Sequence, residues 1–197
     1  MNLVERAKNI IITPKTEWEK VAAEEPNVQQ IMVGYVLPLA LIPTIASIVG
    51  WGVIGILGFT SVTYGIAMGL VQLLNAFLSV LIAAFVIDAL AGSFGSAKNF
   101  GRAVQLVAYS MTPIWIAGIL GILPAIGWLA FLLGLYGLFL LYMGLSPIMK
   151  TPEDKKAVYL IVIIIVLIAI YWILTLILTA IFFAVFGLSL LSALTTY

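Results

Sequence analysis

Five apolar runs, each long enough to cross a lipid bilayer as a helix, constrain the fold of this chain. A hydrocarbon core of roughly 30 Å is crossed by about 20 apolar residues in helical form. The runs cover residues 28–50, 64–90, 103–123, 125–145 and 157–186. The sequence therefore predicts an all-α, polytopic integral membrane protein with five transmembrane helices.

Composition excludes a soluble fold and most catalytic chemistry. Hydrophobic residues make up 64% of the 197 and charged residues 9%, against roughly 25% charged residues in soluble domains. Cysteine and histidine are absent, which excludes thiolate or histidine metal sites and the Ser-His-Asp triad. We expect no catalytic residues, metal or cofactor, and the net charge of +1 without a basic stripe predicts no nucleic-acid partner.

The nine basic residues indicate the orientation, because cytoplasmic loops retain Lys and Arg. Four precede the first run, two lie between the second and third, and three lie between the fourth and fifth. The other connections and the carboxyl tail carry no charge. The sequence thus predicts a cytoplasmic amino terminus and an outer carboxyl terminus. A four-span alternative with a re-entrant first run would mix charged and uncharged loops on one side.

A polar head, residues 1–27, precedes the five-helix domain that is predicted over residues 28–197. Thr13 and Pro14 suit the cap and first turn of a short helix that carries Trp18. Trp18 is interpreted as an anchor at the membrane interface. Before it, an amphipathic helix on the inner membrane face is predicted from apolar residues at helical spacing, namely Leu3, Val4, Ala7, Ile10 and Ile11.

Proline and glycine predict irregular or closely packed spans. Pro38 and Pro43 predict a kinked first span, and Pro113 predicts a bend in the third, because proline lacks a backbone donor. The fifth span is uniformly apolar and is expected to be peripheral and lipid-facing. Close backbone contact is predicted at the four glycines of the fourth span, Gly127, Gly134, Gly137 and Gly144.

Polar residues in the second span are candidate functional groups, because they are costly inside hydrocarbon. Gln72 and Asn75 share one helix face, where they are expected either to bond a neighbouring helix or to line a polar cavity. Asp88 points nearly the opposite way and lies near the cytoplasmic end. It is expected either to pair with Lys98 or Arg102, or to have a functional role.

In the third span, four polar residues fall within one arc of the helix: Arg102, Gln105, Tyr109 and Thr112. This arc could face the polar residues of the second span across a groove, or it could serve packing alone. The candidate polar groove comprises Gln72, Asn75, Asp88, Arg102, Gln105, Tyr109 and Thr112.

Three stretches resemble a known membrane-protein family. They are NFGRAVQLVAYSMTPIWIAGIL at residues 99–120, PKTEWEKVAAE at 14–24 and LYMGLSPIMKTPEDKKAVYLIVIIIV at 141–166. They are similar to the Yip family of Ypt/Rab-interacting membrane proteins, particularly its prokaryotic branch. The five-span arrangement with the head inside, derived above from charge, is also the arrangement that this resemblance implies.

The resemblance also carries functional expectations. Eukaryotic members of the family are linked to Golgi and endoplasmic reticulum vesicle traffic through Rab-type GTPases and other family members. Here the long acidic head with its Asp-Leu-Tyr-Gly-Pro type motif is replaced by 27 residues, a departure that argues against a GTPase contact. The resemblance to the prokaryotic branch implies a location in the prokaryotic cytoplasmic membrane, without an established activity.

Two functional hypotheses follow. The first is a non-enzymatic scaffold or adaptor that binds other membrane proteins or forms a homo-oligomer in the lipid bilayer, with the head and the KTPEDKK loop, residues 150–156, as a cytoplasmic docking surface. The alternative is a small transporter or lipid-binding protein whose polar site lies between the second and third spans.

Overall fold

The computed structural model describes residues 2–55 and 60–182 of the chain, and every regular element in these ranges is helical. The all-α prediction is therefore confirmed for this part of the protein. Helices long and apolar enough to cross a membrane occupy four of its segments: Val28–Ile54, Val62–Phe94, Phe100–Ile122 and Leu129–Met149.

The first of these segments is irregular, as its prolines predict. It begins as α3 (Val28–Ile31), passes through a π-helical turn at Met32–Val36 and continues as α4 (Leu37–Val49). The Leu37 amide donates to the Met32 carbonyl, five residues back, immediately before Pro38, which has no amide to donate. A second π-helical turn, Gly50–Ile54, carries the helix four residues beyond the predicted end of the span.

The second and third segments follow the predicted spans closely. The second is α5 (Val62–Ala91). The third divides into α6 (Phe100–Ser110), α7 (Thr112–Ala117) and a 3₁₀ turn at Gly118–Ile122. The break before Pro113 confirms the predicted bend, because α6 ends at Ser110 and a turn at Met111 separates it from Thr112–Pro113 at the start of α7.

The fourth span is shifted along the chain. It is predicted over residues 125–145, but α8 runs over Leu129–Met149, because hydrogen-bonded turns occupy residues 123–128. Pro147 is accommodated in the last turns of α8, which ends at Lys150 in the left-handed region, with φ of 54°. The fifth predicted span begins within α9 (Lys156–Phe182), and its residues 183–186 lie outside the described residues.

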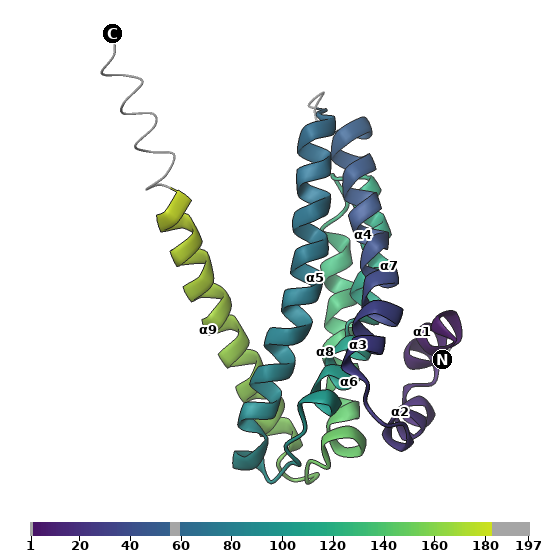
Figure 1. The fold of residues 1–197 in the computed structure, drawn as a ribbon, viewed down its shortest axis with the longest axis vertical. Coiled ribbons are helices and arrows are strands. Elements are labelled where there is room, and N and C mark those ends of the chain that lie inside the picture. The colour runs from purple at the N-terminus through teal and green to yellow at the C-terminus, as the bar shows by residue number, and fades with distance from the viewer. Residues whose placement is uncertain (1, 56–59, 183–197) are drawn as a thin grey trace.

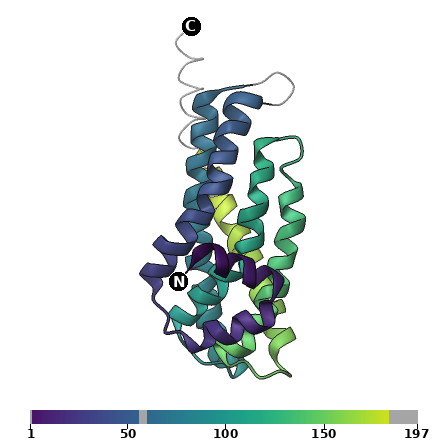
Figure 2. The ribbon, with the colours of Figure 1, turned by 90° about the vertical axis from the view of Figure 1, so that its right-hand side faces the viewer.

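Two short helices form the head. They are α1 (Leu3–Ile12) and α2 (Pro14–Ala23), with Pro14 in the first turn as predicted. Thr13 occupies the N-cap position of α2 as predicted, but its hydroxyl makes no capping bond there and donates instead to the Asn9 carbonyl of α1, 3.2 Å away. Figure 2 shows α1 lying across the outside of the bundle and not along it.

The head and two connections lie at the same end of the bundle, called here the head end (Figure 1). The Ala97 amide donates to the Met149 carbonyl at 2.8 Å, and the Ser96 hydroxyl donates to Thr151 Oγ1 at 2.9 Å. These bonds join the α5–α6 connection to the α8–α9 connection. The head end therefore gathers all three segments of the chain that contain basic residues.

Helix α9 diverges from the other long helices as it leaves the head end (Figure 1). Tyr159 and Ile163 are buried near its start, whereas Ile161, Ile165 and Ile168 are exposed. The described part of α9 is therefore peripheral, as predicted.

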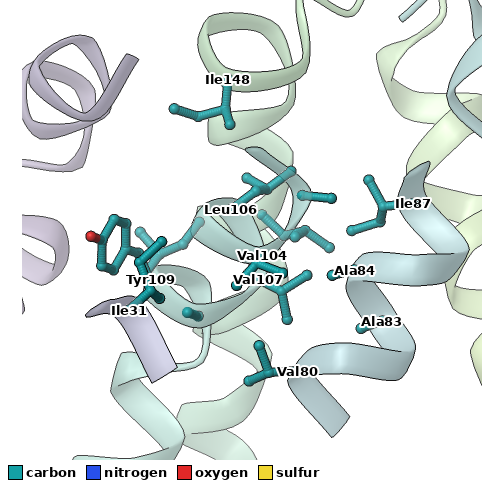
Figure 3. Packing of buried hydrophobic residues seen from close by; sticks show 14 of the residues in the cluster. Ile31, Val80, Ala83, Ala84, Ile87, Val104, Leu106, Val107, Tyr109 and Ile148 are labelled. Carbon is teal, nitrogen blue, oxygen red and sulfur yellow. The ribbon is translucent and has the colours of Figure 1, made fainter. Parts of the chain in front are cut away.

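Helix α6 lies at the centre of the packing. Every residue from Ala103 to Ser110 is buried. Figure 3 shows Ile31 and Tyr109 on one side of α6, and Ala83 and Ala84 of α5 on the other. The two alanines allow α5 to approach closely, and the opposite side of α6 faces the head.

Candidate functional site

The head places a charge cluster in the protein interior. Arg6 is 6% exposed and Glu17 is 3% exposed. Arg6 Nη1 lies 2.8 Å from Glu17 Oε1, and Arg6 Nη2 contacts Glu24 Oε1. Lys20 Nζ lies 3.3 Å from Glu17 Oε2. The buried Arg6 and Glu17 thus pair with each other, as charges removed from water require, while the exposed Glu24 and Lys20 each contact one of them.

Helical spacing explains why Arg6 points inward. It follows Leu3 by three residues and precedes Ile10 by four, so all three lie on one face of α1. Glu17 likewise precedes Val21 by four residues on the buried face of α2. A basic and an acidic residue on two apolar faces are a sequence signal for a buried ion pair, although this pair is not among the predicted site residues.

Tyr109 of α6 is the aromatic centre against which the head packs. The Arg6 guanidinium carbon lies 5.4 Å from the centroid of the Tyr109 ring, a cation–π contact. The Trp18 ring lies 6.3 Å from the same ring, and the Tyr35 ring meets it edge-on at 4.7 Å. Trp18 is only 1% exposed, so its interpretation as an anchor at the membrane interface is wrong.

Gly144 of α8 provides the space that Trp18 occupies. A Cβ atom at Gly144 would lie 2.9 Å from Trp18 Cε2 and 2.4 Å from Leu106 Cδ1. At Gly137 a Cβ would lie 2.7 Å from the Ser110 carbonyl oxygen, whereas at Gly127 the nearest atom would be at 3.6 Å. The predicted close backbone contact is therefore confirmed at Gly137. At Gly144, and at Gly134 beside Ile114, the close neighbours are side chains, and at Gly127 the space is open enough for ordinary van der Waals contact.

Arg102 closes the carboxyl end of α2. Its Nη1 donates to the Glu24 carbonyl at 2.7 Å, to the Val21 carbonyl at 3.2 Å and to Gln105 Oε1 at 3.2 Å. Carbonyls at the end of a helix lack partners within the helix, and a cation there also opposes the helix dipole. Arg102 and Gln105 therefore attach the third span to the head.

A second set of bonds links the third span to the first. The Thr112 hydroxyl donates to the Tyr109 carbonyl at 2.7 Å. Because this bond uses the only hydroxyl proton of Thr112, the Tyr35 hydroxyl is the donor in its own 2.7 Å bond to Thr112 Oγ1. Both bonds are buried, and they join Tyr35 of the first span to Thr112 and the Tyr109 backbone of the third.

These contacts form one site, which we call the head junction. A polar cavity of about 220 Å³ adjoins it and is lined in part by Glu24, Gln105 and Tyr109. The residues of the head junction are Arg6, Glu17, Trp18, Glu24, Tyr35, Arg102, Gln105, Tyr109 and Thr112.

The structure divides the predicted groove. The four polar residues of the third span do lie together, but they face the head and the first span. Gln72 and Asn75 are exposed on the outer surface of α5, and neither side chain has a hydrogen-bond partner among the described residues. The predicted groove between the second and third spans is therefore wrong, since the second span contributes neither amide to it.

Asp88 also stands apart from the head junction. No ion pair joins it to Lys98 or Arg102 in the described ranges, and its buried Oδ1 has no hydrogen-bond partner there. The predicted pairing of Asp88 is wrong because Arg102 turns toward α2. The neighbouring Tyr159 hydroxyl of α9 donates instead to the Ile87 carbonyl.

Comparison with known proteins identifies the family. Residues 8–175 match the Yip1 domain, a range that starts inside α1, includes α2 and all four long apolar segments, and ends inside α9. Comparison with curated proteins and with solved structures gives no match. The match covers most of the chain, and the apolar helices agree with it, so this protein is an integral membrane protein that belongs to the Yip1 domain family.

Proposed function

We propose that this chain is a non-enzymatic scaffold or adaptor of the prokaryotic branch of the Yip family, which binds other membrane proteins or further copies of itself in the bilayer. The observation that carries the proposal is the exposure of Gln72 and Asn75 on α5. Gln72 lies about 15 Å from the start of α5, given the helical rise per residue. This depth is well inside a hydrocarbon core of roughly 30 Å.

The surroundings of the two amides favour association. Leu74 and Leu78, on the same stretch of α5, are exposed apolar residues suited to lipid. An amide exposed to lipid has no water to bond, whereas a polar group on a partner helix can satisfy it. The α5 association face, which we define as the exposed half of α5 that carries Gln72, Asn75, Leu74 and Leu78, therefore suits a helix from another subunit better than it suits lipid.

The proposal includes five spans, with α9 as the fifth, and a cytoplasmic amino terminus in the cytoplasmic membrane. The gathering of all nine basic residues in the three segments at the head end supports this orientation. Residues 1–27 then form the cytoplasmic head, residues 28–197 form the transmembrane domain, and the carboxyl terminus lies outside.

The head end supplies the docking surface of the adaptor. Lys15 and Glu19 are exposed on α2, and Glu153 and Asp154 are exposed in the loop that leads to α9. The head junction holds α2 against α6 and α8, so these exposed charges have a defined arrangement. A water-soluble partner would recognise this charge pattern, while the α5 association face would bind a partner helix within the membrane.

The test is native mass spectrometry of protein released gently from its own membrane. Replacing both amides in the variant Gln72→Leu/Asn75→Leu should weaken retention of the partner subunit about thirtyfold, since two interhelical hydrogen bonds of roughly 1 kcal/mol each are lost. The matched control is Leu74→Ala/Leu78→Ala, which alters the same face without removing an amide and should retain more of the assembly. Equal assembly in wild type and the amide variant, or a wild type that is only monomeric, would contradict the proposal.

A further inference from the structure

A cleft separates the amphipathic helix α1 from the first and third spans. Its volume is about 430 Å³, and Lys8 is the one charged side chain among the described residues that line it. Helix α1 contributes Leu3 and Ile11, α4 contributes Leu39 and Ile42, and α7 contributes Ile116. The cleft is therefore an apolar space with one cationic group, and it lies outside the head junction.

The cleft opens to the surroundings of the bundle. Of its lining residues, Val4 is 74% exposed, Ile12 is 64% exposed and Ile116 is 39% exposed. Helix α1 lies across the spans (Figure 2), which is the orientation of a helix that rests in the membrane interface. A helix α1 that rests there would turn the mouth of the cleft toward lipid.

Lys8 differs from its basic neighbours in the head. Arg6 and Lys20 are engaged by the carboxylates of Glu17 and Glu24. Lys8 is exposed and takes part in no ion pair within the described ranges. Its ammonium group is therefore available to an anion at the mouth of the cleft.

We propose that this cleft binds an anionic glycerophospholipid of the leaflet at the head end, with an acyl chain between α1 and α4 and the phosphate group at Lys8. An apolar cleft with one unpaired cation complements a lipid that carries one apolar chain next to one anionic group. The lipid site shares no residue with the α5 association face, so the lipid proposal and the adaptor proposal can be tested separately.

The test uses the full chain in nanodiscs made from equal parts of phosphatidylglycerol and phosphatidylcholine with identical acyl chains, followed by native mass spectrometry. Wild type should retain phosphatidylglycerol in preference to phosphatidylcholine. Lys8→Gln should lower phosphatidylglycerol occupancy about fivefold, the equivalent of about 1 kcal/mol for one lysine near an anionic membrane surface. Lys15→Gln, which removes an exposed lysine outside the cleft, should leave occupancy unchanged.

A second pair of variants tests the apolar part of the site. Ile116→Trp fills the cleft and should lower the occupancy of both lipids, whereas Ile119→Trp changes an exposed residue outside the cleft and should lower neither. Unchanged phosphatidylglycerol retention in Lys8→Gln, or unchanged lipid retention in Ile116→Trp, would overturn the proposal. A lipid-free dimer that dissociates in Ile116→Trp would also overturn it and would assign the cleft to a second copy of the chain.

Discussion

In the head junction the Arg6 guanidinium contacts two carboxylates and an aromatic ring, whereas Gln72 and Asn75 on α5 have no hydrogen-bond partner among the described residues. Both regions put polar side chains into a mostly apolar protein. In the head junction, polar groups bond to other groups of the same chain. On α5, the two amides must find hydrogen-bond partners outside the described residues.

The difference separates stability from association. Substitutions in the head junction should lower the free energy of unfolding, because they leave buried partners without a bond. Substitutions on the α5 association face should change subunit binding with little effect on the fold of one chain. The predictions below test the first half of this comparison, and the amide variant described above tests the second.

The largest effect is expected for Arg6→Ala. Removing the guanidinium leaves Glu17 buried with only Lys20 beside it, and breaking a buried ion pair costs about 3–5 kcal/mol. The measurement is unfolding by sodium dodecyl sulfate in mixed micelles, followed by tryptophan fluorescence. Lys15→Ala, an exposed site on α2, is the control and should stay within about 0.5 kcal/mol of wild type. A loss below about 1 kcal/mol in Arg6→Ala would show that the head contributes little to stability.

Gly144→Ala should have the next largest effect. The new methyl group would overlap Leu106 and Trp18, and overpacking of this kind costs about 1–3 kcal/mol. Gly127→Ala introduces the same methyl group where the nearest atom is 3.6 Å away, and it should be close to neutral in the same unfolding assay. Equal stability of the two variants would mean that Trp18 does not occupy the space above Gly144.

Tyr35→Phe should cost less, about 0.5–1.5 kcal/mol, because it removes one neutral hydrogen bond and retains the ring. A double-mutant cycle with Thr112→Val isolates the bond between the two hydroxyls. The account predicts that the two substitutions are less than additive in the free energy of unfolding. Strict additivity would contradict the bond that joins the first span to the third.

Glu153 provides the smallest effect. The Ser146 hydroxyl and then Lys156 hold the pKa of its carboxyl below the ordinary value. As the pH falls, the unfolded chain therefore binds a proton at Glu153 before the folded chain does. The stabilisation by the ionised Glu153 carboxylate is complete above the ordinary glutamate pKa, and it is lost as the pH falls through the lower pKa of the folded state.

The effect should be small because the Glu153 side chain is 75% exposed. Apparent melting temperatures measured between neutral and acidic pH should fall slightly more for wild type than for Glu153→Gln. A larger acid sensitivity in Glu153→Gln would reverse the predicted sign.

Much of the fold follows from the sequence, because the bilayer sets the length of each span. The apolar run at residues 64–90 predicts α5 to within two residues at its start and one at its end. The shift of α8 has a local cause, since the turns at residues 123–128 are as apolar as the helix that follows them. Hydropathy measures transfer into lipid and does not distinguish helix from turn there.

The candidate site is predicted only in part. Arg102, Gln105, Tyr109 and Thr112 lie on one arc as helical spacing requires, but the spacing does not reveal which element faces that arc. The second span has polar residues and is the apparent partner in sequence. The head is the actual partner, because Arg6 and the end of α2 supply the charges and carbonyls that satisfy this face.

The central claim is that the head and the loop before α9 form one fixed surface. The chain contains no cysteine, so Glu19→Cys and Asp154→Cys, both exposed positions, can carry nitroxide labels without background. Double electron–electron resonance on the full chain in nanodiscs should give one narrow distance distribution, which should broaden when Arg6→Ala is added. A broad distribution in the labelled chain that retains Arg6 would show that the head moves freely, and it would contradict the account.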